Sequence, residues 1–255
     1  MHANYPRLGL VALALALAQT ALAGAPAGLP ENASARLSGS LTLVQAVPGR
    51  TVDIRIDGRP VRRAADVGDV VGPVRLSAGR HTVTFVSPGE AEVEAAIRVN
   101  AGGSRDVVLH RPAVPAGRPV VSSFRTPTGG VAPGRARLVV ATTASVVPAD
   151  VRVDGRVVFT NIANGESART QVEPGIHRVT LVPSGLAGPV VLGPVDVAVA
   201  PGTVTVLYAV DGPGSGAAIV HTLALRPGGG VAPGRVDTGS TGLARDLPVR
   251  QFGGG

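Results

Sequence analysis

Apolar and polar residues alternate along much of this chain with a period of two. In residues 51–56 (TVDIRI) the apolar residues occupy the even positions and the polar residues the odd positions. Such alternation indicates a β-strand with one buried face. An Asp-Gly step follows at 57–58 and predicts a hairpin, because both positions tolerate a positive φ. Pro60 lacks a backbone donor, so the returning strand is expected at a sheet edge.

This pattern occurs twice. Residues 52–59 (VDIRIDGR) return as 149–156 (ADVRVDGR), and residues 78–86 (AGRHTVTFV) return as 174–182 (PGIHRVTLV). The offset is 97 residues at the Asp-Gly step and 96 at the later Gly. Two copies at this spacing predict two tandem domains of one fold. The repeated residues are turn and core residues, so they define an architecture rather than an activity.

Each copy contains enough short apolar runs for about seven strands, and neither shows an amphipathic helix. In the first copy the expected strands are 41–44, 51–56, 70–71, 74–76, 81–86, 92–99 and 105–109. In the second they are 137–142, 149–153, 157–162, 168–172, 177–182, 195–199, 203–210 and 218–225. The predicted fold class is all-β, with two tandem immunoglobulin-like β-sandwich domains, an N-terminal signal peptide and a disordered tail.

The Gly- and Pro-rich stretches set the predicted boundaries. Proline-rich runs are extended and semi-rigid, which is typical of a linker. The C-terminal stretch has too few apolar residues to pack, which predicts disorder. The expected organisation is a signal peptide at 1–23, a first module at 35–110, a linker at 111–134, a second module at 135–226 and a tail at 227–255.

The leader predicts export. Residues 1–7 are a short basic region, residues 8–18 are apolar, and Ala-Leu-Ala at 21–23 supplies the small residues of a cleavage site. Cleavage is expected after Ala23, with Ala25 as the alternative. The apolar stretch is shorter than the roughly 20 residues that span a bilayer, so no membrane span is expected in the mature chain. The prediction is a secreted or extracellular bacterial protein, associated with the cell envelope in one version of this hypothesis.

Charge and composition limit the classes of partner that are expected. The chain has 24 basic and 17 acidic residues, a formal charge of +7, and no Cys. Every basic residue is Arg, which we attribute to GC-rich coding rather than to function. Charges of both signs are interspersed along the strands and aromatic residues are scarce, so no nucleic-acid partner is expected. Weak adhesion to an anionic envelope is the better use of the excess charge.

Four histidines are candidate functional residues. His81 and His177 occupy matching positions at the start of a core strand, in different modules and without nearby Cys, so convergence on a metal is not expected. Their expected role is to bond a turn carbonyl, with a pH-sensitive or ligand-binding role as the alternative. His110 and His221 lie at strand ends, and the spacing identifies no partner for either.

The repeated acids invite a calcium hypothesis, but no Asp-x-Asp-x-Asp-Gly loop accompanies Asp53, Asp57, Asp150 and Asp154. The densest basic cluster is followed at once by acids, which predicts a solvated loop; it comprises Arg59, Arg62 and Arg63, followed by Asp66 and Asp69.

Two short motifs resemble catalytic loops. Residues 237–240 (DTGS) match an aspartic-protease loop, but such enzymes need two carboxylates and the chain has one copy, so a flexible tail is expected. Gly-Ser-Gly at 214–216 reads as a turn, because no strand-to-helix elbow is present. No catalytic, cofactor-binding or metal-binding residue is predicted, and the ligand is unknown.

Residues 41–58 (LTLVQAVPGRTVDIRIDG) resemble the opening of the bacterial family called domain of unknown function 4397. Residues 137–182 resemble it again, which predicts tandem copies. The chain departs from the family pattern at Gln45, Val47 and Gly49, where members often carry His, Ser and Asp. The resemblance implies export and a β-sandwich, and it supplies no catalytic residues.

The leading hypothesis is a secreted, non-enzymatic structural or binding protein with an unknown envelope polymer or protein as its partner. The alternative is an adhesin-like binder of an anionic envelope glycopolymer through Arg-bearing strand faces. A hydrolase is the remote alternative. A contiguous Arg face would favour the binder, mixed charges would favour the scaffold, and a cleft with coupled titratable groups would favour the enzyme.

Overall fold

The computed structural model describes residues 37–114, 116–212, 216–225 and 236–238. The described residues form strands and turns without an α-helix, and none of them builds a helix long and apolar enough to cross a bilayer. The predicted signal peptide at 1–23 lies outside these residues. So does the predicted tail at 227–255, apart from residues 236–238, which form a short strand instead.

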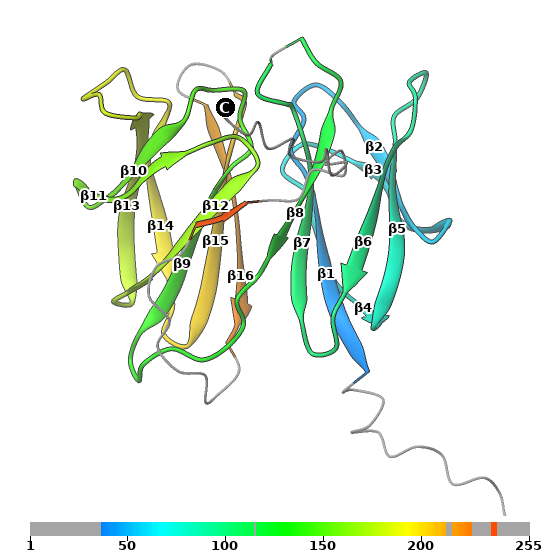
Figure 1. Ribbon diagram of the computed structural model, residues 1–255, viewed down its shortest axis with the longest axis horizontal. Coiled ribbons are helices and arrows are strands. Elements are labelled where there is room, and N and C mark those ends of the chain that lie inside the picture. Colours follow the sequence, from blue (N-terminus) through cyan, green and yellow to red (C-terminus); the bar gives the residue numbers. More distant parts are fainter. Residues whose placement is uncertain (1–36, 115, 213–215, 226–235, 239–255) are drawn as a thin grey trace, which may run out of the picture.

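The first module is a sandwich of two four-stranded sheets (Figure 1). Its inner sheet has the order β4-β1-β7-β8 and contains β1 (Ser38–Gln45), β4 (Val70–Ser77), β7 (Ser104–His110) and β8 (Val120–Arg125). Its outer sheet has the order β3-β2-β5-β6 and contains β2 (Val52–Ile56), β3 (Arg59–Ala65), β5 (Gly79–Val86) and β6 (Val93–Val99). Within the inner sheet β1 and β7 are parallel.

The second module repeats this plan. Its outer sheet has the order β11-β10-β13-β14 and contains β10 (Ala149–Val153), β11 (Arg156–Ile162), β13 (Gly175–Pro183) and β14 (Leu192–Val199). Its inner sheet has the order β16-β15-β9-β12-β17 and contains β9 (Ala136–Thr142), β12 (Glu166–Val172), β15 (Thr203–Val210), β16 (Ala217–Ala224) and β17 (Val236–Thr238). Here β9 and β15 form the parallel pair. The all-β, two-sandwich prediction is confirmed.

The hairpins of the two repeats form as the sequence predicts. Asp57 and Gly58 have φ values of 50° and 74°, and Asp154 and Gly155 have 52° and 78°. Positive φ at both central residues gives a tight turn whose twist matches the flanking strands. The returning strand β3, which contains Pro60, is an edge strand as expected.

Each sandwich encloses an aliphatic core between its sheets. The even residues of β2 point into the first core and its odd residues are partly exposed, as their alternation predicted. Ile54 and Phe85 are fully or almost fully buried there, and Val151 and Leu181 are buried in the second core. Burial of this apolar surface, at roughly 25 cal/mol per Å², is the main force that holds each sandwich together.

Two expectations about strands need correction. Part of the predicted linker at 111–134 is a strand, β8, which pairs antiparallel with β7 and completes the first module. Its short apolar run was masked by the Pro and Gly residues on both sides. The candidates at 70–71 and 74–76 are one strand, β4, whose register against β1 shifts between Leu41 and Leu43.

Candidate functional site

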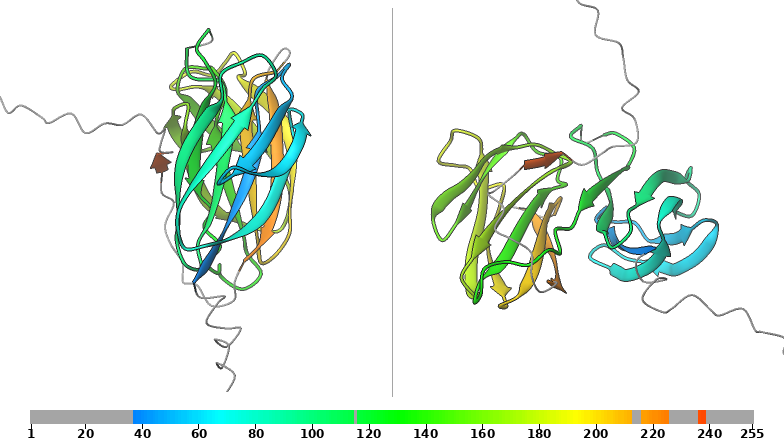
Figure 2. Two further views of the ribbon diagram at one scale, coloured as in Figure 1. Left: turned by 90° about the vertical axis from the view of Figure 1, so that its right-hand side faces the viewer. Right: turned by 60° about the horizontal axis from the view of Figure 1, so that its bottom comes forward.

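The two modules pack against each other through their inner sheets, as the right-hand view of Figure 2 shows. The contact is a third apolar cluster, which we name the seam. The first module contributes Val44, Ala46, Val108 and Phe124, and the second contributes Val139, Ala141, Val204, Val206, Tyr208, Val210 and Ile219. A hydrophobic contact of this kind restrains the relative motion of domains far more than a linker does.

A polar cluster lies inside the seam. Asp106 of β7 accepts a hydrogen bond from the Tyr208 hydroxyl at 2.5 Å, and its Oδ2 lies 3.1 Å from His221 Nε2. The rings of Tyr208 and His221 stack with centroids 6.0 Å apart. We name these three residues the seam lock. They join one strand of the first module to two strands of the second.

The burial of Asp106 and Tyr208 determines the role of the seam lock. The Asp106 side chain is 1% exposed and Tyr208 is fully buried. Burial, followed by the Asp106 charge and hydrogen bond, raises the pKa of Tyr208 well above its usual value of 10, so the phenol stays a proton donor. A buried carboxylate needs such donors because its desolvation is costly. The arrangement is a cross-link between modules, with Asp106 and Tyr208 withdrawn from solvent.

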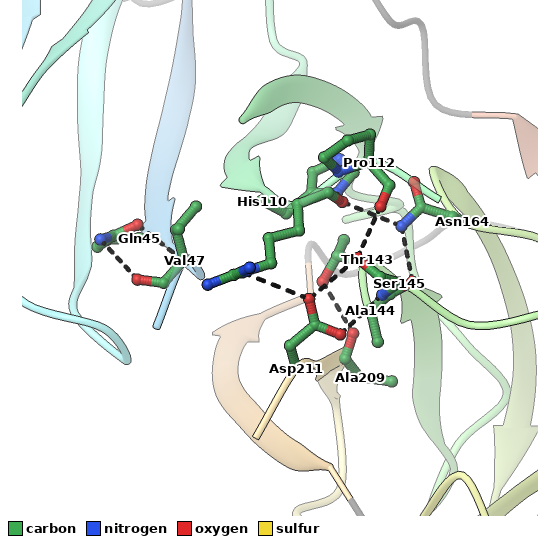
Figure 3. A network of polar contacts seen from close by, with 11 residues as sticks. Gln45, Val47, His110, Pro112, Thr143, Ala144, Ser145, Asn164, Ala209 and Asp211 are labelled. Atoms are coloured by element: carbon green, nitrogen blue, oxygen red, sulfur yellow. Dashed lines mark hydrogen bonds and ion pairs between the residues drawn. The ribbon is translucent and has the colours of Figure 1, made fainter. Parts of the chain in front are cut away.

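A second polar network lies where the chain leaves β7 (Figure 3). The Ser145 amide donates to Asp211 Oδ1 at 2.8 Å, and the Ser145 hydroxyl lies 2.7 Å from the Pro112 carbonyl. Asn164 donates to the carbonyls of Arg111 at 3.2 Å and Ala144 at 2.7 Å. Residues of the second module therefore hold the segment that follows β7.

His110 is part of the same region. Its Nδ1 lies 2.7 Å from the Arg111 carbonyl and its Nε2 lies 2.8 Å from the Ser122 hydroxyl. A carbonyl only accepts, so Nδ1 carries the proton and Nε2 accepts from Ser122. Burial lowers the pKa of His110 to about 4, so the ring is neutral at neutral pH. The sequence spacing did not identify these partners, nor those of His221.

The repeated histidines have the structural role predicted for them. His81 Nε2 lies 2.9 Å from the Ser77 carbonyl, and its Nδ1 lies 2.7 Å from Asp57 in the hairpin turn. His177 makes the same pair of contacts, at 2.8 Å to the Glu173 carbonyl and 2.7 Å to Asp154. We name each pair a hairpin clamp. The hydrogen bond to Asp57 raises the pKa of His81, and the bonds from the histidines lower the pKa values of Asp57 and Asp154.

The other repeated acids are also used within the fold. Asp53 accepts from the Ala64 amide at 2.9 Å, and Asp150 accepts from the Ser184 hydroxyl at 2.6 Å and from the Asn161 and Gly185 amides. These donors lower the pKa of Asp150. Within the described residues, no group of three or more His, Cys, Asp or Glu side chains is placed to hold a metal ion.

Arginines on the outer sheets lie beside acids. Arg55 lies 3.4 Å from Glu92 on the first module, and Arg178 lies 3.2 Å from Asp196 on the second. In the basic cluster of β3, Arg62 pairs with Asp69 at 2.9 Å in an exposed position. The outer faces are therefore mixed in charge, which is the pattern expected of a scaffold rather than of a polyanion-binding face.

Two grooves lie along the gap between the edge strands β6 and β8 of the first module. The larger, about 740 Å³, is lined by acids and arginines together, and Arg50 pairs with Glu90 in its wall. The smaller, about 300 Å³, lies at the other end of the gap. Its only charged lining residues are Arg105 and Arg125.

Of three remaining sequence features, one has a structural role and two lie partly outside the described residues. Gln45, at a position that departs from the family pattern, is buried and holds the 47–50 turn through bonds to the Val47 amide and the Arg50 carbonyl. Of the protease-like motif at 237–240, only the backbone of 237–238 is described, in β17. Residues 214–215 of the Gly-Ser-Gly motif lie outside the described residues.

The fold and the seam define a class of proteins built from two β-sandwiches packed through their inner sheets. Residues 39–149 match the family described as a domain of unknown function, DUF4397, so the chain carries a domain of this family. The matched segment extends past the first module through β9, which contributes Val139 and Ala141 to the seam. It ends at residue 149, so tandem copies of the family stay a prediction. No curated protein matches the chain.

Proposed function

We propose that the protein is exported and acts, without catalysing a reaction, as a structural or binding protein outside the cell or in its envelope. The signal-peptide pattern of residues 1–23 supports export. The second module is a second copy of the same domain, which the matching outer-sheet order and the repeated hairpin clamp support.

One observation carries the structural role. The two sandwiches are joined by a buried seam that includes a cross-linking carboxylate, so the pair presents fixed outer surfaces at a fixed spacing. The repeated His and Asp side chains are occupied by bonds that hold turns and strands. Side chains used in this way stabilise a fold and leave no free nucleophile–base pair among themselves.

Export and envelope association are tested together. The full chain is expressed with a C-terminal tag in a bacterium, and the mature N-terminus is sequenced by mass spectrometry; a start at Gly24 is expected, and retention of residues 1–23 would contradict export. The mature protein is then incubated with purified envelope fractions at low and physiological salt. Retention at both salts supports envelope binding through contacts other than long-range charge.

Retention that disappears at physiological salt would instead support the adhesin-like alternative, because binding through arginines is screened by salt. Absence of retention at both salts would contradict an envelope polymer as the partner. The mixed charges of the outer sheets predict that salt-sensitive retention is the weaker component.

A further inference from the structure

The smaller groove of the first module differs in charge from the larger groove and from the ion-paired outer sheets. It lies where β6 ends and β8 ends, and its lining includes Arg105, Arg125, Ser104 and Asn100. None of its described lining residues is acidic. The nearest carboxylate along β7, Asp106, is directed to the opposite side of the sheet, where it bonds Tyr208 in the seam.

The two arginines form a cross-strand pair. Arg105 of β7 lies directly opposite Arg125 of β8, and Arg105 donates to the Ser123 hydroxyl at 2.9 Å. Like charges directly opposite on neighbouring strands are destabilising. Burial, and after it the charge of Arg125, lowers the pKa of Arg105. An anion in the groove would relieve both costs.

The second module shows that the fold does not require this pair. Arg105 lies opposite Leu41 of β1. Leu41 corresponds to Leu138 at the 97-residue offset, and Leu138 lies opposite Thr205 of β15. Thr205 is therefore the counterpart of Arg105. Thr205 lies opposite Thr222 in β16, and their hydroxyls are 3.1 Å apart. The second module thus has two threonines that hydrogen-bond each other where the first module has two arginines.

One wall of the groove, the segment that follows β8, is held in place by the second module. Arg137 of β9 is buried and donates to the carbonyls of Pro127, Gly129 and Gly130, at 2.5, 2.7 and 3.3 Å. Pro127 and Gly129 line the groove. Another arginine therefore fixes the segment that closes the site. Thr126 also lines the groove, and its buried hydroxyl has no partner among the described residues.

We propose that this groove binds an oxyanion group, a phosphate or sulfate carried by a small molecule or by a polymer, between Arg105 and Arg125. Guanidinium groups suit such ligands because they donate several hydrogen bonds in one plane. This inference goes beyond the proposed function, because it holds whether or not the protein is exported and names a site that the scaffold role does not need.

The test uses the full chain with inorganic phosphate, inorganic sulfate and polyphosphate, and titrations are followed by amide NMR shifts and calorimetry. The groove variant is Arg105→Thr/Arg125→Thr, which imports the threonine pair of the second module. The single variant Arg125→Thr changes a more exposed residue and retains the Arg105–Ser123 bond. The matched control is Arg80→Thr/Arg98→Thr, which removes a cross-strand arginine pair from the exposed outer sheet.

Binding of phosphate or sulfate by the wild type is expected to weaken by at least ~10-fold in the groove variant and by ~4-fold or more in Arg125→Thr. The control is expected to change it by less than ~2-fold. Groove-dependent binding that is much tighter for polyphosphate identifies a polymeric carrier; equal affinity per phosphate identifies a small one. Absence of binding to the wild type, or equal losses in the groove and control variants, would overturn the proposal.

Discussion

The outer sheets of the two modules are alike, whereas their inner sheets differ in the residues at corresponding positions. In the outer sheets the hairpin clamp recurs almost unchanged, with His81 on Asp57 and His177 on Asp154. In the inner sheets, corresponding positions hold different chemistry. The difference teaches that the repeat preserves what each sandwich needs to fold, while the inner sheets have become specialised for each other.

The divergent inner positions are complementary across the seam. By the strand pairing that relates Arg105 to Thr205, Asp106 corresponds to Val206, and Val108 corresponds to Tyr208. The first module thus supplies the acceptor and the second supplies the donor. The bond joins positions that do not correspond in the two copies, and the reciprocal positions are held by Val206 and Val108, so one such Asp–Tyr pair is present across the seam.

The largest effect is expected from Tyr208→Phe, which removes one hydroxyl and leaves the Asp106 carboxylate buried with His221 alone. Loss of a donor to a buried charged acceptor costs about 3 kcal/mol or more, measured as the free energy of urea unfolding. The double variant Asp106→Val/Tyr208→Phe removes donor and acceptor together, and it is expected to lose less than Tyr208→Phe does. Equal stability of wild type and Tyr208→Phe would show that the lock does not stabilise the seam.

The next largest effect is a pH dependence of stability that arises from His110, in the inner sheet of the first module. The folded-state pKa of His110 is about 4, below the value of 6.5 in an unfolded chain. As pH falls from 6.5 to 4 the unfolded state takes up the proton first. The contribution is therefore fully present above pH 6.5, and about 3 kcal/mol is lost by pH 4.

Urea unfolding at several pH values from 4 to 7.5 measures this loss. The variant His110→Asn lacks the titratable ring, so its decline of stability over this range is expected to be shallower than that of the wild type. His110 corresponds to Val210 in the second module, so no matching histidine obscures the comparison. Parallel pH profiles for wild type and variant would contradict the assignment.

The smallest effect concerns the hairpin clamps. Because the pKa of His81 is raised, the stability that His81 contributes is present below about pH 6.5 and is lost as pH rises through its folded-state pKa. Because the pKa of Asp57 is lowered, the stability that Asp57 contributes is present above about pH 3.8 and is lost as pH falls through its folded-state pKa. Asp57→Asn keeps the turn but removes the charge, and exposure of the carboxylate limits the cost to under ~1 kcal/mol.

Asp154→Asn is the matched change in the second module. It is expected to cost less than Asp57→Asn, because the His81 side chain is 9% exposed and that of His177 is 14% exposed. Thermal unfolding of the two variants at pH 5.5 and pH 9 measures the difference. A larger loss for Asp154→Asn would reverse the predicted order.

The sequence predicted the outer sheets better than the inner ones, for a physical reason. Strands such as β2 bury one face, so alternation and the Asp-Gly turn identify them. The central inner strands β1, β7, β9 and β15 are largely buried on both faces; every residue of β9 is buried. Such strands read as continuous apolar runs, which carry no sign of which face meets the other module.

The candidate sites were harder to predict because their partners are distant in sequence. Asp106 and Tyr208 are 102 residues apart, and Asp106 and His221 are 115 apart. No local spacing relates them. The one available signal was an Asp directly before the apolar run of β7, since an acid that becomes buried requires a partner. The carbonyl bonds of His81 and His177 were predicted from their place at the start of a core strand, whereas their bonds to Asp57 and Asp154 were not.

The central claim is that the seam fixes the two modules as one rigid unit. The chain has no Cys, so cysteines introduced at Ala96 of β6 and Ala198 of β14, both exposed on the outer sheets, accept spin labels without interference. Pulsed electron paramagnetic resonance then measures the distance between the labels. A single narrow distance distribution is predicted, unchanged between low and high salt. A broad or multimodal distribution would contradict a rigid unit.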